Sequence, residues 1–124
     1  MEIIISNSSG RPIYEQITAQ IKNLILSGEL SEGQALPSMR QLARDLRISV
    51  ITTKRAYEDL EREGFLTNVP GKGCFVSAKD PGLLREETLR RIEAALQRAV
   101  DLAVSGGVSL QELTETLTLL YEGD

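Results

Sequence analysis

Residues 36–76 read LPSMRQLARDLRISVITTKRAYEDLEREGFLTNVPGKGCFV, and this stretch decides the fold. It contains two short helix patterns joined by a tight polar turn, followed by a hairpin with a Gly-Lys-Gly tip. That order is typical of a winged helix-turn-helix, in which the second helix of the pair enters the major groove of DNA. The stretch therefore indicates a DNA-reading protein rather than an enzyme.

The starts of the two helices are marked by residues with strong positional preferences. Ser38, with Gln41 three residues later, predicts a capping box at the start of the first helix of the pair. Ser49 predicts the cap of the next helix, which runs to about Glu63. The sequence therefore predicts a helix pair with a very short connection.

One more helix is predicted before this stretch, and two strands at its end. Pro12 opens a run of apolar residues at helical spacing, which Ser27-Gly28 ends. Residues 65–69 and 74–76 are rich in β-forming side chains and predict two short strands. The tip between them, residues 70–73, holds glycines, which adopt positive φ angles freely.

A different pattern follows a predicted linker at residues 78–82. It consists of a long helical segment that ends near Gly106-Gly107 and a shorter one that begins with a capping box at Ser109 and Glu112. Apolar residues recur at helical spacing on both segments, at Leu89, Ile92, Leu96, Val100, Leu113, Leu117 and Leu120. A helical hairpin of this size has too little mass to bury such seams alone, so we expect a second copy of the chain to cover them in a homodimer.

The predicted fold class is therefore α+β. Residues 1–77 form a winged helix-turn-helix with a small β-hairpin wing, and residues 78–124 form an α-helical hairpin used for dimerisation. No apolar stretch approaches the roughly 18 residues that span a bilayer, and the first residues lack a secretory signal, so we expect the chain in the cytoplasm. The single cysteine, Cys74, excludes an internal disulfide and a cysteine-based metal cluster, and its strand position is typical of a small core residue.

The net charge of −4 is unevenly distributed along the 124 residues. Residues 1–80 carry ten basic and ten acidic side chains, whereas residues 81–124 carry four basic and eight acidic ones. Between residues 36 and 55, Asp45 is the single acidic residue, and the basic residues are Arg40, Arg44, Arg47, Lys54 and Arg55. Contact with phosphate requires such a local basic patch, whatever the charge of the whole chain.

The outer stripe of the third helix supplies candidate contacts to DNA. Lys54 and Arg55 have the chemistry to contact phosphate or guanine. Thr52 is able to hydrogen-bond a base or a phosphate, and Ile51 is able to pack on a thymine methyl group. Periodicity alone is equally compatible with a solvated helix face, but the short helix before it and the hairpin after it favour the groove.

Arg40 and Lys72 each have two interpretations. Arg40 either reaches the phosphate backbone or groove edge from the start of the second helix, or pairs with Asp45 on the surface. Lys72 either contacts phosphate or the minor groove from between two glycines, or is a solvated turn lysine. Tyr14 and Tyr57 fall at apolar-face positions, which favours core packing with the hydroxyl at the rim over base stacking.

Four blocks of this sequence carry a resemblance to a known family: Leu36-Pro37-Ser38-x-Arg40-x-Leu42-Ala43, Ser49-x-x-Thr52, Glu63-Gly64-Phe65 and Gly71-Lys72-Gly73-x-Phe75-Val76. Together and in register, they resemble the DNA-binding domain of the GntR family of bacterial transcription regulators, over about residues 10–77. The short helical tail, and residues 50–57, are similar to the YtrA-type subgroup, whose members lack large effector-binding domains.

The resemblance implies which residues meet DNA. In that family the residue matching Arg40, the first residues of the third helix and the wing tip at Gly71 contact the operator. Many members carry Arg at the position of Val50, and because Val cannot hydrogen-bond a base, we expect base readout to shift to its neighbours. The full set of candidate DNA-binding residues is Arg40, Ser49, Val50, Ile51, Thr52, Lys54, Arg55, Gly71 and Lys72. The resemblance also implies a homodimeric repressor of a transporter operon. Such a dimer is expected to read a near-palindromic operator, with the third helix in the major groove and the wing on flanking DNA.

Two other classes of function compete with this interpretation. A winged helix used for protein contact, with the acidic tail as docking surface, would need neither the basic third helix nor Lys72. An enzyme is disfavoured because the chain has no histidine, no Walker-type phosphate loop and no metal-ligand spacing. We therefore expect no catalytic residue, no metal and no cofactor. The sequence leaves open whether a small-molecule effector, a metal or neither controls DNA binding.

Overall fold

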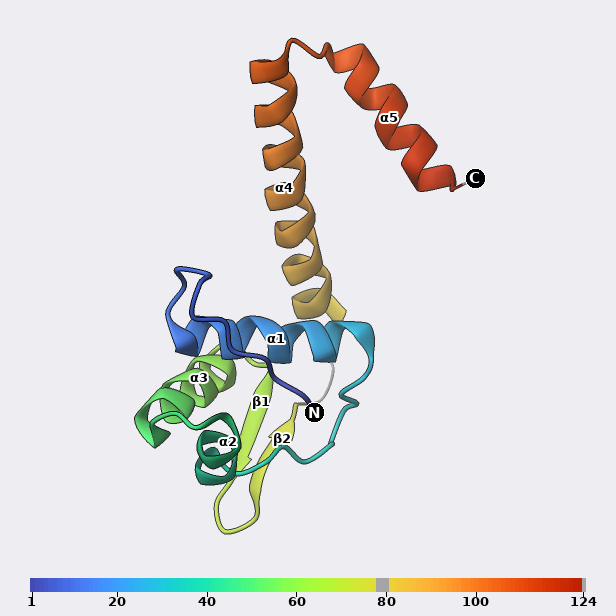
Figure 1. Cartoon of the computed structure of the whole chain (residues 1–124). Coiled ribbons are helices and arrows are strands. Elements are labelled where there is room, and N and C mark those ends of the chain that lie inside the picture. Colours follow the sequence, from blue (N-terminus) through green and yellow to red (C-terminus); the bar gives the residue numbers. More distant parts are fainter. Residues whose placement is uncertain (78–80, 124) are drawn as a thin grey trace. The chain divides into compact units, whose positions relative to one another are not determined.

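The computed structural model describes residues 1–77 and 81–123, and Figure 1 shows its elements in chain order. They are α1 (Ile13–Ser27), α2 (Met39–Leu46), α3 (Val50–Arg62), β1 (Leu66–Val69), β2 (Gly73–Val76), α4 (Pro81–Gly106) and α5 (Leu110–Glu122). This is the predicted α+β order of a winged helix-turn-helix followed by two further helices. The chain divides into two compact units, Met1–Leu84 and Arg85–Asp124.

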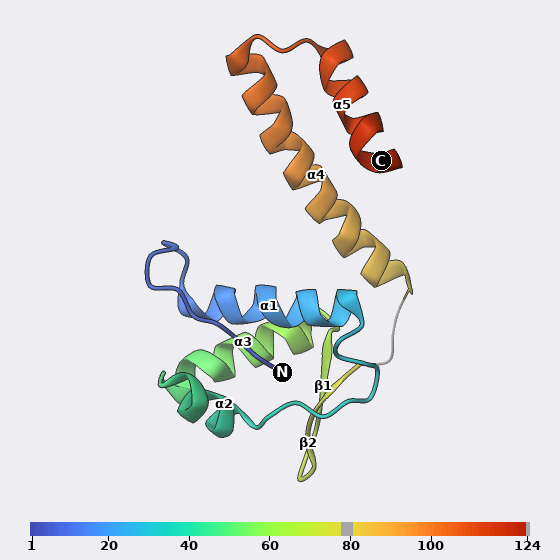
Figure 2. The ribbon, with the colours of Figure 1, turned by 45° about the vertical axis from the view of Figure 1, so that its right-hand side comes forward.

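Helix α3 is the centre of the first unit, because both α1 and α2 pack against it. Figure 2 shows α1 lying alongside α3. Ile17 and Ile21 of α1 and Ala56 and Leu60 of α3 are completely buried where these helices meet the core. Burial of an isoleucine or leucine side chain contributes about 1.5–3 kcal/mol relative to exposure, so this packing fixes how α3 presents its outer face.

The predicted helix starts are confirmed, but only one half of the predicted capping box forms at α2. The Ser38 hydroxyl accepts a hydrogen bond from the Gln41 backbone N–H at 3.0 Å, and the Ser49 hydroxyl accepts one from Ile51 at 3.1 Å. The Gln41 side chain does not return to Ser38, because its amide donates to Asp45 Oδ1 at 2.7 Å one turn later. Helix α1 begins at Ile13, one residue later than predicted.

The wing is a two-stranded antiparallel sheet in which Leu66 pairs with Val76 and Val69 with Gly73. The Lys72 N–H donates to the Val69 carbonyl at 2.9 Å, and Gly71 has a φ of 76°. With Pro70 before it, this glycine occupies the position of a type II turn that requires positive φ.

We expect Gly71→Ala to lower the free energy of unfolding by about 1 kcal/mol, because the left-handed conformation is costly for a residue with a Cβ atom. Among the described residues, no atom beyond Gly71 and its two chain neighbours lies within 4 Å of the position that this Cβ would take, so the cost comes from the backbone and not from a clash. Thermal denaturation measures the effect, with Lys72→Ala as the control. Wild-type stability of Gly71→Ala would contradict the turn described here.

The segment before α2 joins the wing, although the sequence shows no strand pattern there. The Gly33 N–H donates to the Val76 carbonyl at 2.9 Å, and the Leu36 N–H donates to the Cys74 carbonyl at 2.9 Å. The chain that leads into α2 is thus bonded to β2, so the wing and the start of α2 are held in a fixed relation.

Two glutamines of α1 hold the N-terminal segment through hydrogen bonds that the sequence pattern does not predict. The Gln20 side chain accepts from the Ile4 N–H at 2.8 Å and donates to the Ile4 carbonyl at 2.6 Å. Gln16, which is buried, accepts from the Ser6 N–H at 2.8 Å and donates to the Arg11 carbonyl at 3.0 Å. The two side chains thus supply hydrogen-bond partners for backbone groups that a neighbouring strand would otherwise satisfy.

The second unit consists of most of α4 together with α5. The predicted linker at residues 78–82 is wrong at its end, because Pro81 and Gly82 already belong to α4, while residues 78–80 lie outside the described residues. The Ser109 hydroxyl accepts from the Glu112 N–H at 3.1 Å and caps α5, which is one half of the capping box predicted there. No helix in the described part of the chain is long and apolar enough to cross a membrane.

Candidate nucleic-acid interface

A groove of about 460 Å³ lies between α2, α3 and the wing. It is lined by Ser38, Met39 and Arg40 from the start of α2, by Val50, Ile51, Lys54 and Tyr57 from α3, and by Asn68, Gly73 and Cys74 from the wing. Three elements of a winged helix-turn-helix thus contribute to one surface, with the first turns of α3 facing it.

The exposed face of α3 follows from what its other face buries. Thr53, Ala56, Tyr57 and Leu60 are buried at helical spacing. The opposite stripe is therefore turned outward, and Ile51 is 74% exposed. An apolar side chain this exposed, beside cations on a groove, is suited to contact a thymine methyl group.

Two buried hydroxyl groups fix α2 against α3. Thr53 Oγ1 lies 2.9 Å from the Met39 carbonyl and 3.0 Å from the Val50 carbonyl. The Tyr57 hydroxyl donates to the Pro37 carbonyl at 2.7 Å. Burial raises the pKa of Tyr57 well above its ordinary range, so the phenol stays protonated and remains a donor. The position of Arg40 relative to α3 is thereby set.

Most cations in the described part of the first unit form no ion pair. Among the residues that the structure describes, no carboxylate lies within ion-pair distance of Arg40, Arg44, Arg47, Arg55 or Lys72. The alternative in which Arg40 pairs with Asp45 is therefore wrong for this structure, since Asp45 accepts from Gln41 instead.

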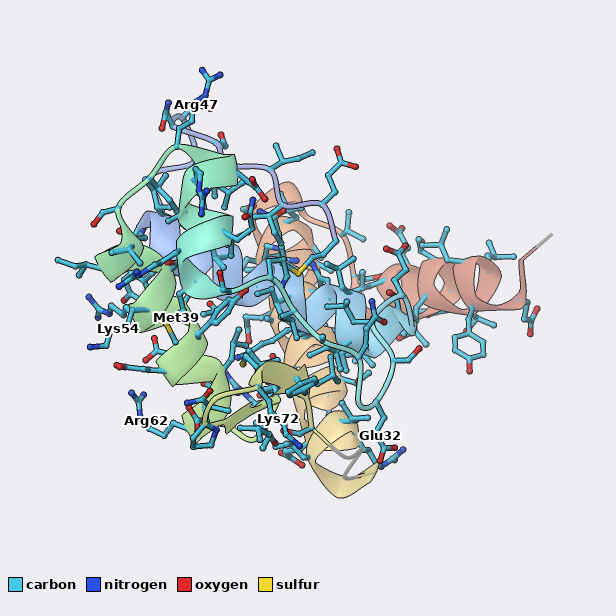
Figure 3. All side chains as sticks on the ribbon, turned by 90° about the horizontal axis from the view of Figure 1, so that it is seen from below. Glu32, Met39, Arg47, Lys54, Arg62 and Lys72 are labelled. Atoms are coloured by element: carbon cyan, nitrogen blue, oxygen red, sulfur yellow. The ribbon has the colours of Figure 1, made fainter. Side chains whose placement is uncertain are left out.

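Lys54 has only a weak partner. Its Nζ lies 3.8 Å from Glu58 Oε1, and both side chains are more than half exposed, so the pair contributes little. Figure 3 shows Lys54 and Arg62 projecting outward from the same side of α3. The charge of Lys54 thus remains available to a phosphate or a base at the groove.

The structure gathers some of the predicted site residues and separates others. Arg40, Val50, Ile51 and Lys54 line the groove together. Thr52 is partly buried and is not among the groove-lining residues, and Gly71 and Lys72 lie exposed at the wing tip. The Ser49 hydroxyl is engaged as the cap of α3, while the Arg55 guanidinium is turned toward α1, with its Cζ 3.7 Å from the centroid of the Tyr14 ring.

Met39 and Asn68 also line the groove, although neither was predicted from the sequence. Asn68 pairs with Cys74 across the wing, and it shares a face of β1 with the buried Leu66. A polar residue two positions after a buried one on a short strand is the signal that identifies it. In the described ranges, no group of three or more His, Cys, Asp or Glu side chains is placed to hold a metal ion.

Comparison with known sequences identifies the family. Residues 13–76 match the bacterial regulatory proteins of the gntR family. The chain is 37% identical over 113 residues to the HTH-type transcriptional repressor YtrA of Bacillus subtilis, and the match covers 91% of this chain and 87% of YtrA. Two other relatives are matched over only 30% and 17% of their own lengths.

Comparison with solved structures supports the same family. The chain is similar to a transcriptional antiterminator from Listeria monocytogenes EGD-e, with a TM-score of 0.74, 30% identity, and coverage of 100% of this chain and 92% of that one. It is also similar to AraR(DBD) in complex with operator ORX1, with a TM-score of 0.55, 28% identity, and coverage of 62% and 96%. This chain belongs to the GntR family of bacterial regulatory proteins, and its first unit is a winged helix-turn-helix.

Proposed function

We propose that this protein is a homodimeric transcription repressor that reads a near-palindromic operator, with α3 in the major groove and the wing on flanking DNA. The observation that carries the proposal is the groove between α2, α3 and the wing, where Arg40 and Lys54 lie beside the exposed Ile51. The cations supply phosphate or guanine contacts, and the isoleucine supplies an apolar contact. The similarity to AraR(DBD), solved with an operator, supports this assignment.

The surface of the tail supports the dimer. Its seam residues Leu89, Ile92, Leu96, Val100 and Leu117 are 41 to 48% exposed, Leu120 is 75% exposed, and Leu113 is partly buried. No described residue of α5 is buried. Continuous apolar surface of this kind is covered in folded proteins, and a second copy related by two-fold symmetry covers both chains at once.

In this proposal residues 1–77 bind DNA and residues 78–124 hold the dimer. The match to the repressor YtrA over most of both chains supports repression as the outcome of binding. We further propose that the regulated operon is of the transporter type, which the YtrA-type tail favours. We also propose that the protein acts in the cytoplasm, where bacterial DNA lies. The genes that neighbour the coding sequence test the operon.

The binding test uses a duplex that the purified chain selects from a random pool and a shuffled duplex of the same composition. Affinity for the selected duplex is expected to fall with salt, with a log-log slope of about −0.9 for each phosphate neutralised. Salt-insensitive binding would exclude the proposed phosphate contacts, and an intact dimer that binds neither duplex would favour a protein-docking role instead.

We expect Lys54→Ala to cost about 1 to 3 kcal/mol of binding free energy on the selected duplex if Lys54, which lines the groove, contacts a base edge there as proposed. Fluorescence anisotropy with both duplexes measures the loss. Arg62→Ala is the matched control, since Arg62 lies on the same helix outside the groove and pairs with Asp59 at 3.0 Å. An equal loss on selected and shuffled duplexes would assign Lys54 to phosphate alone.

A further inference from the structure

Arg55 and Tyr14 lie against each other although they belong to different helices. The Arg55 Cζ atom, on α3, is 3.7 Å from the centroid of the Tyr14 ring, on α1. This distance is that of a guanidinium stacked on the face of a ring. Tyr14 is itself held, because its ring packs against the core. The Tyr14 ring thus holds the Arg55 guanidinium in a defined position.

The stack orients Arg55 without neutralising it. In the part of the chain that the structure describes, no carboxylate forms an ion pair with Arg55, whereas Lys54 faces Glu58 and Arg62 pairs with Asp59. A guanidinium stacked by its face keeps its N–H donors at its edge, where they are free to bind phosphate oxygens in pairs. Arg55 is therefore an oriented cation with unused donors.

Arg55 also differs from its neighbours in where it points. Val50, Ile51 and Lys54 line the groove, and Arg55 does not. It leaves α3 on the flank that faces α1. When a helix lies in the major groove, its leading face meets the base edges and its flanks meet the phosphates that border the groove. With α3 in the major groove, a cation on such a flank would therefore meet backbone rather than bases.

We propose that Arg55 binds a backbone phosphate at the edge of the major groove, and that Tyr14 is the positioning residue that holds it there. The proposal rests on the DNA-binding function proposed above and narrows it. Arg55 contributes affinity to any sequence and does not select a base. A free arginine side chain loses conformational entropy when it binds, and an arginine already stacked on a ring loses less.

The experiment compares single variants, a double variant and a matched control. Arg55→Ala removes the cation, and Arg55→Lys keeps the charge but removes the planar face. Tyr14→Leu removes the ring and keeps apolar volume, while Tyr14→Phe keeps the ring and serves as control. Affinities for the selected and the shuffled duplex are measured by fluorescence anisotropy over a series of salt concentrations.

Arg55→Ala is expected to weaken binding to both duplexes by the same factor, about tenfold at low salt, and to make the salt slope shallower by about 0.9. Tyr14→Leu is expected to weaken binding to both by about threefold, with Tyr14→Phe unchanged. Adding Tyr14→Leu to Arg55→Ala should cause no further loss, because the ring acts only through the arginine. Arg55→Lys should resemble Tyr14→Leu and keep the wild-type salt slope.

Four results would overturn the proposal. A loss confined to the selected duplex would assign Arg55 to base reading, and additive losses in the double variant would separate Tyr14 from Arg55. Wild-type affinity of Arg55→Ala, with Lys54→Ala impaired, would remove the phosphate contact and leave the proposed function standing. Failure of the unmodified chain to bind either duplex would contradict both this proposal and the proposed DNA-binding function.

If circular dichroism shows that Tyr14→Leu is unfolded, the comparison of Arg55→Lys with Arg55→Ala decides whether stacking of the guanidinium matters for affinity.

Discussion

Leu96→Asp in α4 is expected to convert the dimer into a monomer and to weaken operator binding by at least about a hundredfold. The loss is large because a monomer gives up the linked second half-site contact. Leu96 lies on the exposed apolar face of α4 that also carries Ile92 and Val100. A carboxylate buried there without a partner opposes association, since ionised groups are costly to remove from water. Sedimentation velocity measures the mass, and fluorescence anisotropy measures the affinity.

The matched control is Leu102→Asp, which makes the same change on the same helix. Leu102 is 73% exposed and lies six residues beyond Leu96, which places it about 120° around the helix from the seam. We expect this variant to remain dimeric and to bind the operator as the wild type does. A dimer that survives Leu96→Asp, or equal dissociation by both variants, would remove this seam from the proposed interface.

The parts of the fold that sequence predicts well are those fixed by neighbours in the chain. The Ser38 and Ser49 hydroxyl groups bond to backbone N–H groups two or three residues away, so their spacing alone identifies the helix starts. Gly71 follows Pro70 in a tight turn whose geometry involves only four consecutive residues. The order of helices and wing follows from these local signals.

Two local predictions were wrong because the residues involved are compatible with two different local structures. Gln41 would complete a capping box, but Asp45 one turn later offers its amide a carboxylate acceptor. Pro81-Gly82 has the composition of a linker, and yet proline is also well suited to the first turn of a helix, where α4 begins. Composition alone does not distinguish these outcomes.

The candidate site could not be predicted in full from the sequence, because it depends on contacts between residues that are distant in the chain. The sequence allows Arg55 either a phosphate or a guanine, and only the packing of α1 on α3 places the Tyr14 ring beneath it. Gln16 and Gln20 lie one helical turn apart, and their polarity suggests solvated positions on α1. In the structure both side chains form hydrogen bonds with the N-terminal segment. Contacts of this kind depend on tertiary structure, which periodicity does not encode.

Tyr57→Ala is expected to lower the free energy of unfolding by about 3 to 5 kcal/mol, the largest stability effect that we predict for a single substitution. Tyr57 is 1% exposed, and its ring fills the space between the core and the floor of the groove. Tyr57→Phe keeps the ring and removes only the bond to the Pro37 carbonyl, so we expect a loss of about 1 to 2 kcal/mol. Urea denaturation at neutral pH measures both. Equal losses in the two variants would contradict the separate roles of ring and hydroxyl.

The Phe variant also tests the protonation of this group. Burial raises the pKa of Tyr57 above its ordinary value of 10.0, so the folded state keeps the phenol neutral where the unfolded chain ionises it. The resulting contribution to stability is fully present below about pH 10 and is lost as the pH rises further. Tyr57→Phe lacks this titration, so its stability should fall less steeply above about pH 10 than that of the wild type. Burial also raises the pKa of the Cys74 thiol, but that group is common to both proteins and does not distinguish them.

The same variant links stability to DNA binding. The Tyr57 hydroxyl donates to the Pro37 carbonyl, just before the α2 turn that carries Arg40, and Tyr57 lines the groove together with Lys54 and Ile51. At neutral pH, where Tyr57→Phe remains folded, a loss of operator affinity reports displacement of α2 and not unfolding. We expect that loss to be about threefold, equal on selected and shuffled duplexes if Arg40 contacts phosphate, and larger on the selected duplex if Arg40 reads a base. Unchanged affinity for both duplexes would mean that the helix pair is fixed by Thr53 and the core alone.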